Sequence, residues 1–171
     1  ITVGIVDAAG AIATAIVIRA VLLWVDGLDI NTFVAITAGF IVSQAMLVLV
    51  TRIKEHQYAT NNQNDCMQNA FAEGQIALAI RYAGQVISTA LAVTAASHFL
   101  TYSPETLMIN LIGWLVFGIV MTLLVALLTS IAKRLVLMGI NLVEEVDQQH
   151  NIGVACVEMA ISISIALILA A

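Results

Sequence analysis

Four ionisable side chains lie inside apolar stretches of this 171-residue chain: Asp7, Arg19, Arg81 and Glu158. A charged group within a membrane-spanning helix costs about 2.5–3.5 kcal/mol on insertion scales, so such residues are usually paired or functional. Arg19 lies near the end of its stretch, from which its long side chain can reach the lipid headgroups. Asp7, Arg81 and Glu158 are therefore the residues that indicate chemistry within the membrane.

The spacing of these three residues predicts that they meet. When residues 1–10 are placed above residues 75–84 and 151–160, Asp7 and Arg81 share a position and Glu158 is offset by one. If the three helices begin on the same face, each charge lies about 9 Å along its helix, at about 1.5 Å per residue. We expect an ion-pair cluster of one cation between two carboxylates, at which the first, third and fifth helices converge.

Such a cluster can have two roles. It can fix the helix register through polar contacts worth about 0.6–2 kcal/mol each, or it can form an ion or proton relay. Transporters usually show helices broken by Gly or Pro in mid-span, and the chain has one Pro, so the structural role is favoured. Further polar residues could extend a path through the bilayer: Gln44, Gln85, Ser88, Asn110, Ser162 and Ser164.

The other reactive residues form no catalytic pattern. The three histidines and Cys66 lie in or beside polar connectors, and Cys156 lies in an apolar run, without the spacing of metal or haem ligands. The sequence contains neither a Gly-rich phosphate loop nor a nucleophile elbow. The six basic residues are scattered and form no nucleic-acid patch. We therefore predict no enzyme activity, no cofactor, no metal and no nucleic-acid partner.

The composition indicates that these residues reside in a membrane protein. Hydrophobic residues make up 61% of the chain and charged residues 10%, and the mean hydropathy is +1.03. Soluble domains carry about 25% charged residues, and so short a chain has too little interior to bury this much apolar surface. Its apolar runs of about 20 residues fit helices rather than the alternating strands of a barrel. The sequence predicts an all-α, polytopic transmembrane bundle of about five helices.

Five segments are long and apolar enough to span the bilayer: residues 2–24, 31–51, 76–97, 105–131 and 152–171. Short loops at 25–30 and 98–104 lie on one side, and longer connectors at 52–75 and 132–151 lie on the other. Basic residues flank only the connectors, so the connectors and the N-terminus are predicted to be cytoplasmic. These residues are Arg52, Lys54, Lys133 and Arg134.

The two connectors differ in pattern. Residues 61–65 are all Asn, Gln or Asp, which favours a solvated loop flanked by helical turns in the first connector. In the second, apolar residues at helical spacing predict an amphipathic helix in the membrane interface, and the alternative is a long lead-in to the fifth span. The apolar positions are Leu135, Met138, Leu142 and Val146.

Self-similarity divides the chain into parallel two-helix repeats. Residues 1–74 form repeat one, residues 75–150 form repeat two, and residues 151–171 are the first helix of a third, incomplete repeat, after which a sixth helix could follow. Chance similarity between Ala-rich and Val-rich spans is the alternative interpretation. We expect the first helix of each repeat to make the inner contacts and the second helices to face lipid. The predicted helix-packing residues are Gly4, Gly10, Gly84 and Ala160.

The residues at the starts of two repeats carry a family resemblance. Residues 73–84 and 150–155 resemble the bacterial inner-membrane proteins of the YjfL type, the family named domain of unknown function 350. In that family a connector leads into a span of the form Asn-x-Ala-x-Ala-x-x-x-x-Gly, twice per protein, whereas this chain has Gln75 for Asn and Ala160 for Gly. The similarity runs from about Asn31 to the end. It implies a bacterial inner membrane and an association with envelope-stress systems that contain membrane-remodelling proteins.

Together these features predict an integral inner-membrane structural or partner protein, a homo-oligomer or part of a larger membrane complex, linked to envelope stress or membrane maintenance. The small-residue helices, the amphipathic connector and the lack of extramembrane domains support this function. The alternative is a small channel or transporter subunit that uses Asp7, Arg81 and Glu158. In either case the expected partners are the lipid bilayer and other membrane proteins. Because the chain opens at Ile1 inside an apolar segment, we also expect residues to precede it.

Overall fold

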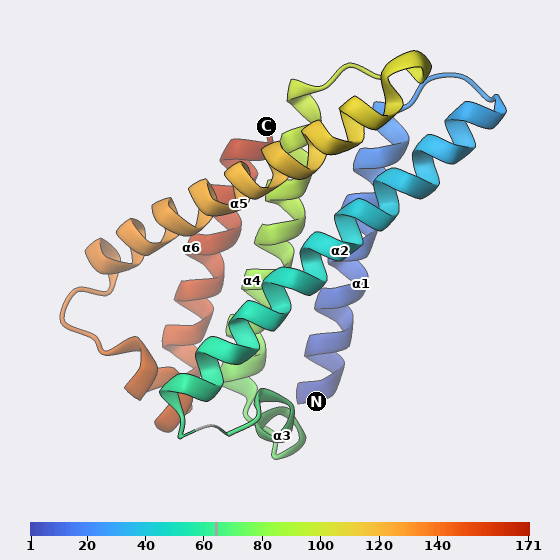
Figure 1. Cartoon of the computed structure of the whole chain (residues 1–171). Coiled ribbons are helices and arrows are strands. Elements are labelled where there is room, and N and C mark those ends of the chain that lie inside the picture. Colours follow the sequence, from blue (N-terminus) through green and yellow to red (C-terminus); the bar gives the residue numbers. More distant parts are fainter. Residues whose placement is uncertain (64) are drawn as a thin grey trace.

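Five long helices make up most of the computed structural model, which describes residues 1–63 and 65–171 (Figure 1). All the regular elements of these residues are helical, and the five long helices are apolar enough to cross a membrane. The chain is therefore an all-α multi-pass membrane protein in contact with the lipid bilayer. The long helices are α1 (Thr2–Trp24), α2 (Ile30–Asn61), α4 (Ile76–Ala96), α5 (Leu107–Val136) and α6 (Ile152–Ala170).

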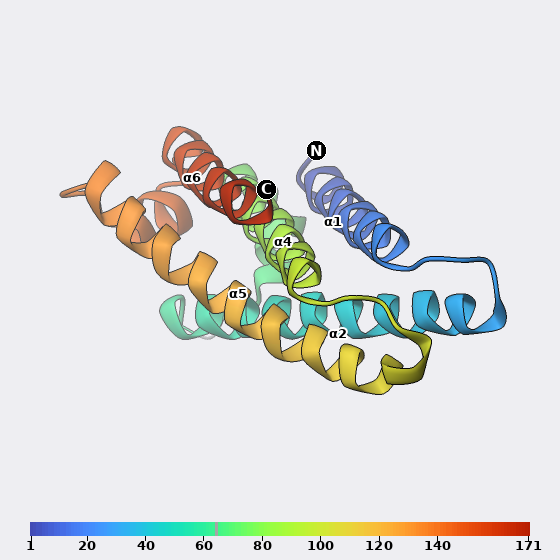
Figure 2. The same ribbon diagram turned by 90° about the horizontal axis from the view of Figure 1, so that it is seen from above.

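The long helices form two layers (Figures 1 and 2). Helices α1, α4 and α6 run side by side with α4 in the middle, and α2 and α5 cross one face of this row. In the most apolar 18 residues of α4, 67% are buried, against 22–28% in the other long helices. Helix α4 is thus the centre of the bundle, and α1 and α6 flank it. The division into repeats at 1–74, 75–150 and 151–171 remains a prediction.

Helices α2 and α5 are longer than a perpendicular span requires. Their 32 and 30 residues correspond to about 48 and 45 Å, whereas the hydrocarbon core is about 30 Å thick. They run obliquely across the row in Figure 1, and tilt is one way in which long helices adapt to a bilayer.

The first connector contains more helix than the sequence indicates. Helix α2 does not end at Thr51 but continues through Asn61, because no Gly or Pro interrupts it and Arg52 pairs with Glu55 one turn later at 2.8 Å. The short helix α3 (Met67–Ala72) then follows. Tyr58 and Phe71 are buried between these segments and α4. Helix therefore extends further into the predicted loop from both sides, and Asn64 of that loop lies outside the described residues.

The predicted amphipathic helix in the second connector is wrong. Helix α5 ends at Val136, and Gly139 has a φ of +83°, a left-handed conformation that ends a helical run. A π-helix of one turn, η3 (Glu144–Gln148), follows. Met138 is 81% exposed whereas Val146 is fully buried, so the apolar residues do not share one face. The turn at Gly139 instead brings η3 back against the bundle.

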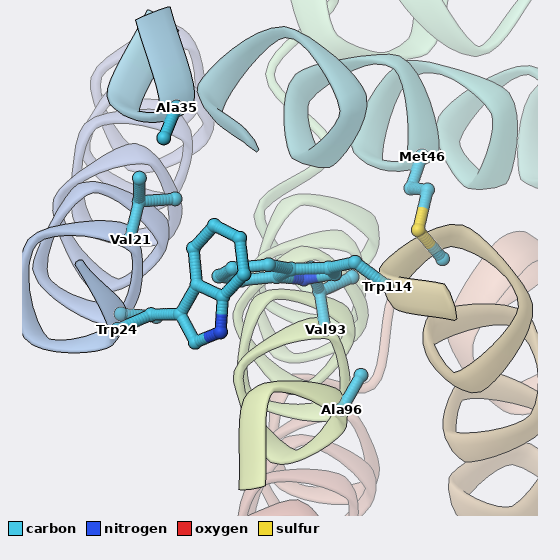
Figure 3. Close-up of a cluster of buried hydrophobic side chains, with 8 residues drawn as sticks. Val21, Trp24, Ala35, Met46, Val93, Ala96 and Trp114 are labelled. Atoms are coloured by element: carbon cyan, nitrogen blue, oxygen red, sulfur yellow. The ribbon is translucent and has the colours of Figure 1, made fainter. Parts of the chain in front are cut away.

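An aromatic cluster holds the helices together at the end with the short loops (Figure 3). The rings of Trp24 and Trp114 meet edge to face, with centroids 5.0 Å apart. The indole N–H of Trp24 donates to the carbonyl of Leu100 at 3.2 Å, and this hydrogen bond links the 97–106 loop to the end of α1. Val21, Ala35, Met46, Val93 and Ala96 pack around these rings. The cluster therefore joins α1, α2, α4 and α5.

Of the four predicted helix-packing residues, only Gly84 makes a close helix contact within the chain. A Cβ atom at Gly84 would lie 2.7 Å from the Cα atom of Met159 on α6, so the backbones of α4 and α6 meet there. Contrary to the prediction, a Cβ at Gly4 or Gly10 would meet nothing within 4 Å, and Ala160 is exposed. The buried residues of α1 include instead Ala9, Ala13, Val17 and Ala20.

We expect Gly84→Ala to destabilise the bundle by about 1–3 kcal/mol, because the added methyl group must push the α6 backbone away. Gly10→Ala is the matched control and should not destabilise, since it adds a methyl group in open space in the same kind of helix. The thermal midpoints of both variants in detergent measure the difference. Equal midpoints would show that α4 and α6 do not meet at Gly84.

Candidate functional site

Four charged side chains from four elements meet at the connector end of the bundle. The Nε atom of Arg81 on α4 lies 2.6 Å from Glu158 Oε2 on α6, and its Nη1 atom lies 2.6 Å from Asp147 Oδ1 in η3. The ammonium of Lys133, in the last turn of α5, lies 2.7 Å from Glu158 Oε1. We call Arg81, Lys133, Asp147 and Glu158 the charge network.

The charge network is buried and electrically balanced. The side chains of Asp147 and Glu158 are 2% and 3% exposed, and those of Arg81 and Lys133 are 13% and 17% exposed. Two positive charges therefore face two negative ones. A buried ion pair is tolerated only when its geometry is good and its remaining polar atoms are bonded, because leaving water is costly for each ion.

Each polar atom of the network has a partner. The Nη2 atom of Arg81 donates to the backbone carbonyl of Leu142 at 2.6 Å, and the amide of Asn62 donates to Asp147 Oδ2 at 3.3 Å. Both oxygens of Glu158 are occupied by Arg81 and Lys133. Burial raises the pKa of Asp147, and the adjacent Arg81 guanidinium opposes this shift. The network thus contains saturated ion pairs rather than a free acid or base.

Local structure explains how Arg81 and Glu158 come together. Each lies in the second turn of its helix, and the close approach of α4 and α6 at Gly84 and Met159 is next to Glu158. The start of α6 is fixed by Asn151, whose side chain accepts from the Val154 N–H at 3.2 Å and donates to Glu145 at 2.7 Å. The cap therefore links α6 to η3, the element that carries Asp147.

Asp7 does not join the charge network. It is exposed on α1, and no ion pair of Asp7 occurs among residues 1–63 and 65–171. Helix α1 packs through the face of Ala9 and Ala13, and Asp7 lies about 200° around the helix from Ala9 at about 100° per residue. The alignment placed Asp7 and Arg81 at one depth but did not include the direction of each side chain. Asp147 is the second carboxylate instead.

Sequence reasoning missed Asp147 and Lys133 as members of the network. In the sequence, Lys133 indicates only that the second connector is flanked by basic residues. Asp147 is not distinguished from Glu144 and Glu145, which precede it and carry the same charge. One signal was available, because a guanidinium has five N–H donors and Glu158 alone cannot satisfy them. That signal calls for further acceptors but does not say which residues supply them.

A cavity of about 360 Å³ with a mixed polar and apolar wall adjoins the charge network between α2, α4, α5 and α6, and we call it the polar cavity. Lys133 belongs to both the network and the cavity wall. On the α4 and α6 side, the hydroxyls of Ser88 and Ser162 donate to the backbone carbonyls of Gln85 and Glu158 at 3.0 and 2.8 Å. The wall also includes Lys54, Thr122, Thr129, Ser130 and Arg134.

The structure gathers only part of the predicted polar path. Gln85, Ser88 and Ser162 line the polar cavity. The other three residues lie elsewhere: Gln44 contacts Thr14 between α2 and α1, Asn110 bonds residues of the 97–106 loop, and Ser164 is exposed. In the part of the chain that the structure describes, no three His, Cys, Asp or Glu side chains are grouped to hold a metal.

Comparison with known proteins finds one family. A family model described as Domain of Unknown Function (DUF350) matches residues 23–171. No curated protein and no solved structure matches the chain. The charge network and the polar cavity lie wholly within the matched residues, whereas almost all of α1 precedes them.

We expect Arg81→Gln to lower the free energy of unfolding by about 3–5 kcal/mol, because it leaves the buried Asp147 carboxylate without its cation. Adding Asp147→Asn should restore part of the loss, since Lys133 and Glu158 still form a neutral pair. Unfolding of both variants in detergent measures these energies.

Arg52→Gln is the control, because Arg52 is 75% exposed and its pair with Glu55 lies at the surface, where such pairs contribute about 0–1 kcal/mol. If Arg81→Gln is no more harmful than Arg52→Gln, or if Asp147→Asn adds to the damage, the network does not stabilise the fold as described.

Proposed function

The chain belongs to the DUF350 family, and we propose that it is a structural protein of the bacterial inner membrane that assembles with further copies of itself. The proposal includes connectors on the cytoplasmic side, supported by the basic residues that flank them, and a role in membrane maintenance or envelope stress, supported by the family resemblance. It includes no enzyme activity. The saturated charge network supports a structural role, because every charge in it already has a partner within the chain.

The exposed face of α1 is the observation that carries the proposal. Gly4, Ala8, Ala11 and Ala15 are all exposed and lie on the side of α1 opposite its buried residues. We call these four residues the small-residue stripe. In lipid, helices attract each other through close backbone packing, which small residues permit and large ones prevent. The stripe therefore suits a second helix, and no helix among residues 1–63 and 65–171 covers it.

The exposed carboxylate of Asp7 also favours a protein contact on this face of α1. It lies beside the small-residue stripe and is exposed, and a carboxylate facing lipid costs about 2.5–3.5 kcal/mol. A contact with a polar partner reduces this cost. Most exposed residues of α5 between Met108 and Leu128 are apolar by contrast, for example Ile119, Leu123 and Leu127.

A second copy of the chain satisfies both requirements. A two-fold contact brings the same patch of each copy together and is the commonest arrangement of soluble homo-oligomers. Two small-residue stripes can then pack closely, in the manner of Gly-x-x-x-Gly dimers. The two Asp7 side chains would lie at the same depth in such a dimer, so each could have a polar partner in the other copy.

We expect Ala11→Cys to form a disulfide-linked dimer in native membranes treated with a membrane-permeant oxidant, once Cys66 and Cys156 are replaced by Ser. The matched control is Leu123→Cys, which places a thiol on a 64% exposed position of α5 away from the stripe. Gel mobility measures the products. A product with Ala11→Cys that contains a different protein would indicate a hetero-complex, and no product from Ala11→Cys or Ala8→Cys would overturn the proposal.

The polar cavity favours a second candidate function, a small channel or transporter subunit. The cavity lies among membrane-spanning helices and has a partly polar wall. The structural proposal predicts that proteoliposomes with the purified chain pass ions no faster than empty vesicles. Flux in the wild type that is lost in Gln85→Leu, which places an apolar side chain at the cavity wall, would instead support transport.

A further inference from the structure

We propose that the polar cavity is a binding site for a phosphate-type oxyanion, carried either by an anionic lipid headgroup or by free phosphate. This goes beyond the proposed function and does not rest on it, because assembly through α1 does not use the cavity. The argument depends on the charges of the wall, the hydroxyls without partners, and the position of the cavity in the bundle.

The charges of the cavity wall are positive and only partly neutralised. Lys54, Lys133 and Arg134 line the cavity, and no Asp or Glu is among the described residues of its wall. The charge of Lys133 is already paired with Glu158. Lys54 donates to the neutral Gln57 at 3.2 Å, and the ion pairs of the described residues include neither Lys54 nor Arg134. An anion in the cavity would balance this surplus, whereas a cation would increase it.

The carboxylates of the charge network are not available to neutralise Lys54. A smaller hollow of about 90 Å³ is lined by Lys54 together with Arg81 and Asp147. Asp147 already accepts from Arg81 and Asn62, and Glu158 accepts from Arg81 and Lys133. The charge network is thus neutral by itself, and Lys54 adds an uncompensated positive charge beside it.

Two hydroxyls of the wall lack the partner that a buried polar group needs. The Oγ1 atoms of Thr122 and Thr129, both on α5, are buried and have no hydrogen bond. Thr129 as a whole is only 7% exposed. An unpaired buried hydroxyl costs about 1–3 kcal/mol, so a ligand that accepts from it is stabilising. By contrast, the Ser88 and Ser162 hydroxyls already donate to backbone carbonyls, so the wall hydroxyls without a partner are on α5.

Size and lining indicate the class of ligand. Small-molecule pockets measure about 300–1,000 Å³, and this cavity is about 360 Å³, more than one ion needs. Ammonium groups and hydroxyls are common donors to phosphate oxygens. The wall also has apolar residues, including Val50, Ala92 and Val125, which suit a group attached to the phosphate, such as a lipid glycerol.

The position of the cavity brings it within reach of lipid headgroups. Lys133 and Arg134 lie in the last turn of α5, at the end of the bundle that carries the connectors. Basic residues at the membrane surface attract anionic headgroups. A headgroup can therefore enter from the adjacent leaflet, and free phosphate can enter from the aqueous side.

The test measures ligand binding to the purified full chain in a neutral detergent, by native mass spectrometry and by the thermal midpoint. The probes are phosphatidylglycerol, the zwitterionic phosphatidylcholine, and inorganic phosphate. We expect an anionic probe to bind and to raise the midpoint, and phosphatidylcholine to do neither. Stabilisation by phosphatidylglycerol alone identifies a lipid headgroup as the source, and stabilisation by inorganic phosphate identifies the free anion.

Variants connect the binding to the cavity. Lys54→Gln should weaken binding about tenfold or more and Thr129→Val several-fold, since each removes one donor. Lys54→Arg keeps the charge and should keep binding. Arg52→Gln is the matched control, because Arg52 is on the same helix but does not line this cavity.

The proposal is overturned if neither phosphatidylglycerol nor inorganic phosphate binds, or if Arg52→Gln weakens binding as much as Lys54→Gln does. The midpoint without ligand shows whether each variant folds, and Thr129→Val serves as the test if Lys54→Gln does not. Cross-linking through Ala11→Cys should be the same in all these variants, so a failure of this inference is distinguishable from a failure of the proposed assembly.

Discussion

The neutrality of charge inside an apolar bundle is the constraint on which this structure depends. Arg81 cannot leave the interior, because it lies in the second turn of the central helix α4 with little exposed surface. Its guanidinium therefore requires acceptors from the elements packed around α4. Glu158 and Asp147 supply the charges, Leu142 supplies a carbonyl, and Lys133 balances the second carboxylate. One buried cation thereby determines how α5, η3 and α6 are arranged.

Backbone geometry makes this pairing possible. The missing side chain of Gly84 allows α6 to approach α4 closely, and the left-handed turn at Gly139 directs the chain from α5 back toward the bundle. The Asn151 cap then fixes where α6 begins, relative to η3. The aromatic cluster holds the opposite end, so the bundle is fixed at both ends by different forces (Figure 3). The polar cavity lies between the helices and reaches Lys133 and Arg134 at the connector end.

The sequence predicts the position of a residue along its helix better than it predicts the side of the helix on which that residue faces a neighbour. Arg81 and Glu158 were expected to pair because their positions along two parallel helices match, and they lie 2.6 Å apart. The alignment gives Asp7 the same depth, but α1 packs through its buried alanines and the Asp7 side chain is exposed. Gly4 and Ala160 differ from Gly84 for the same reason. Spacing along one helix does not determine which face meets a neighbour, because the crossing of two helices depends on both.

The sequence by itself determined the membrane class, the five helices, the family and the two residues at the centre of the charge network. These follow from local quantities, namely hydropathy over about 20 residues and the rise of a helix. Only the tertiary structure decided that Asp147 and Lys133 complete the network and that Lys54 and Thr129 share a cavity. Lys54 lies far from Thr129 and Lys133 in the chain. Asp147 lies in a connector whose path depends on the turn at Gly139. Their positions result from packing, which no local pattern contains.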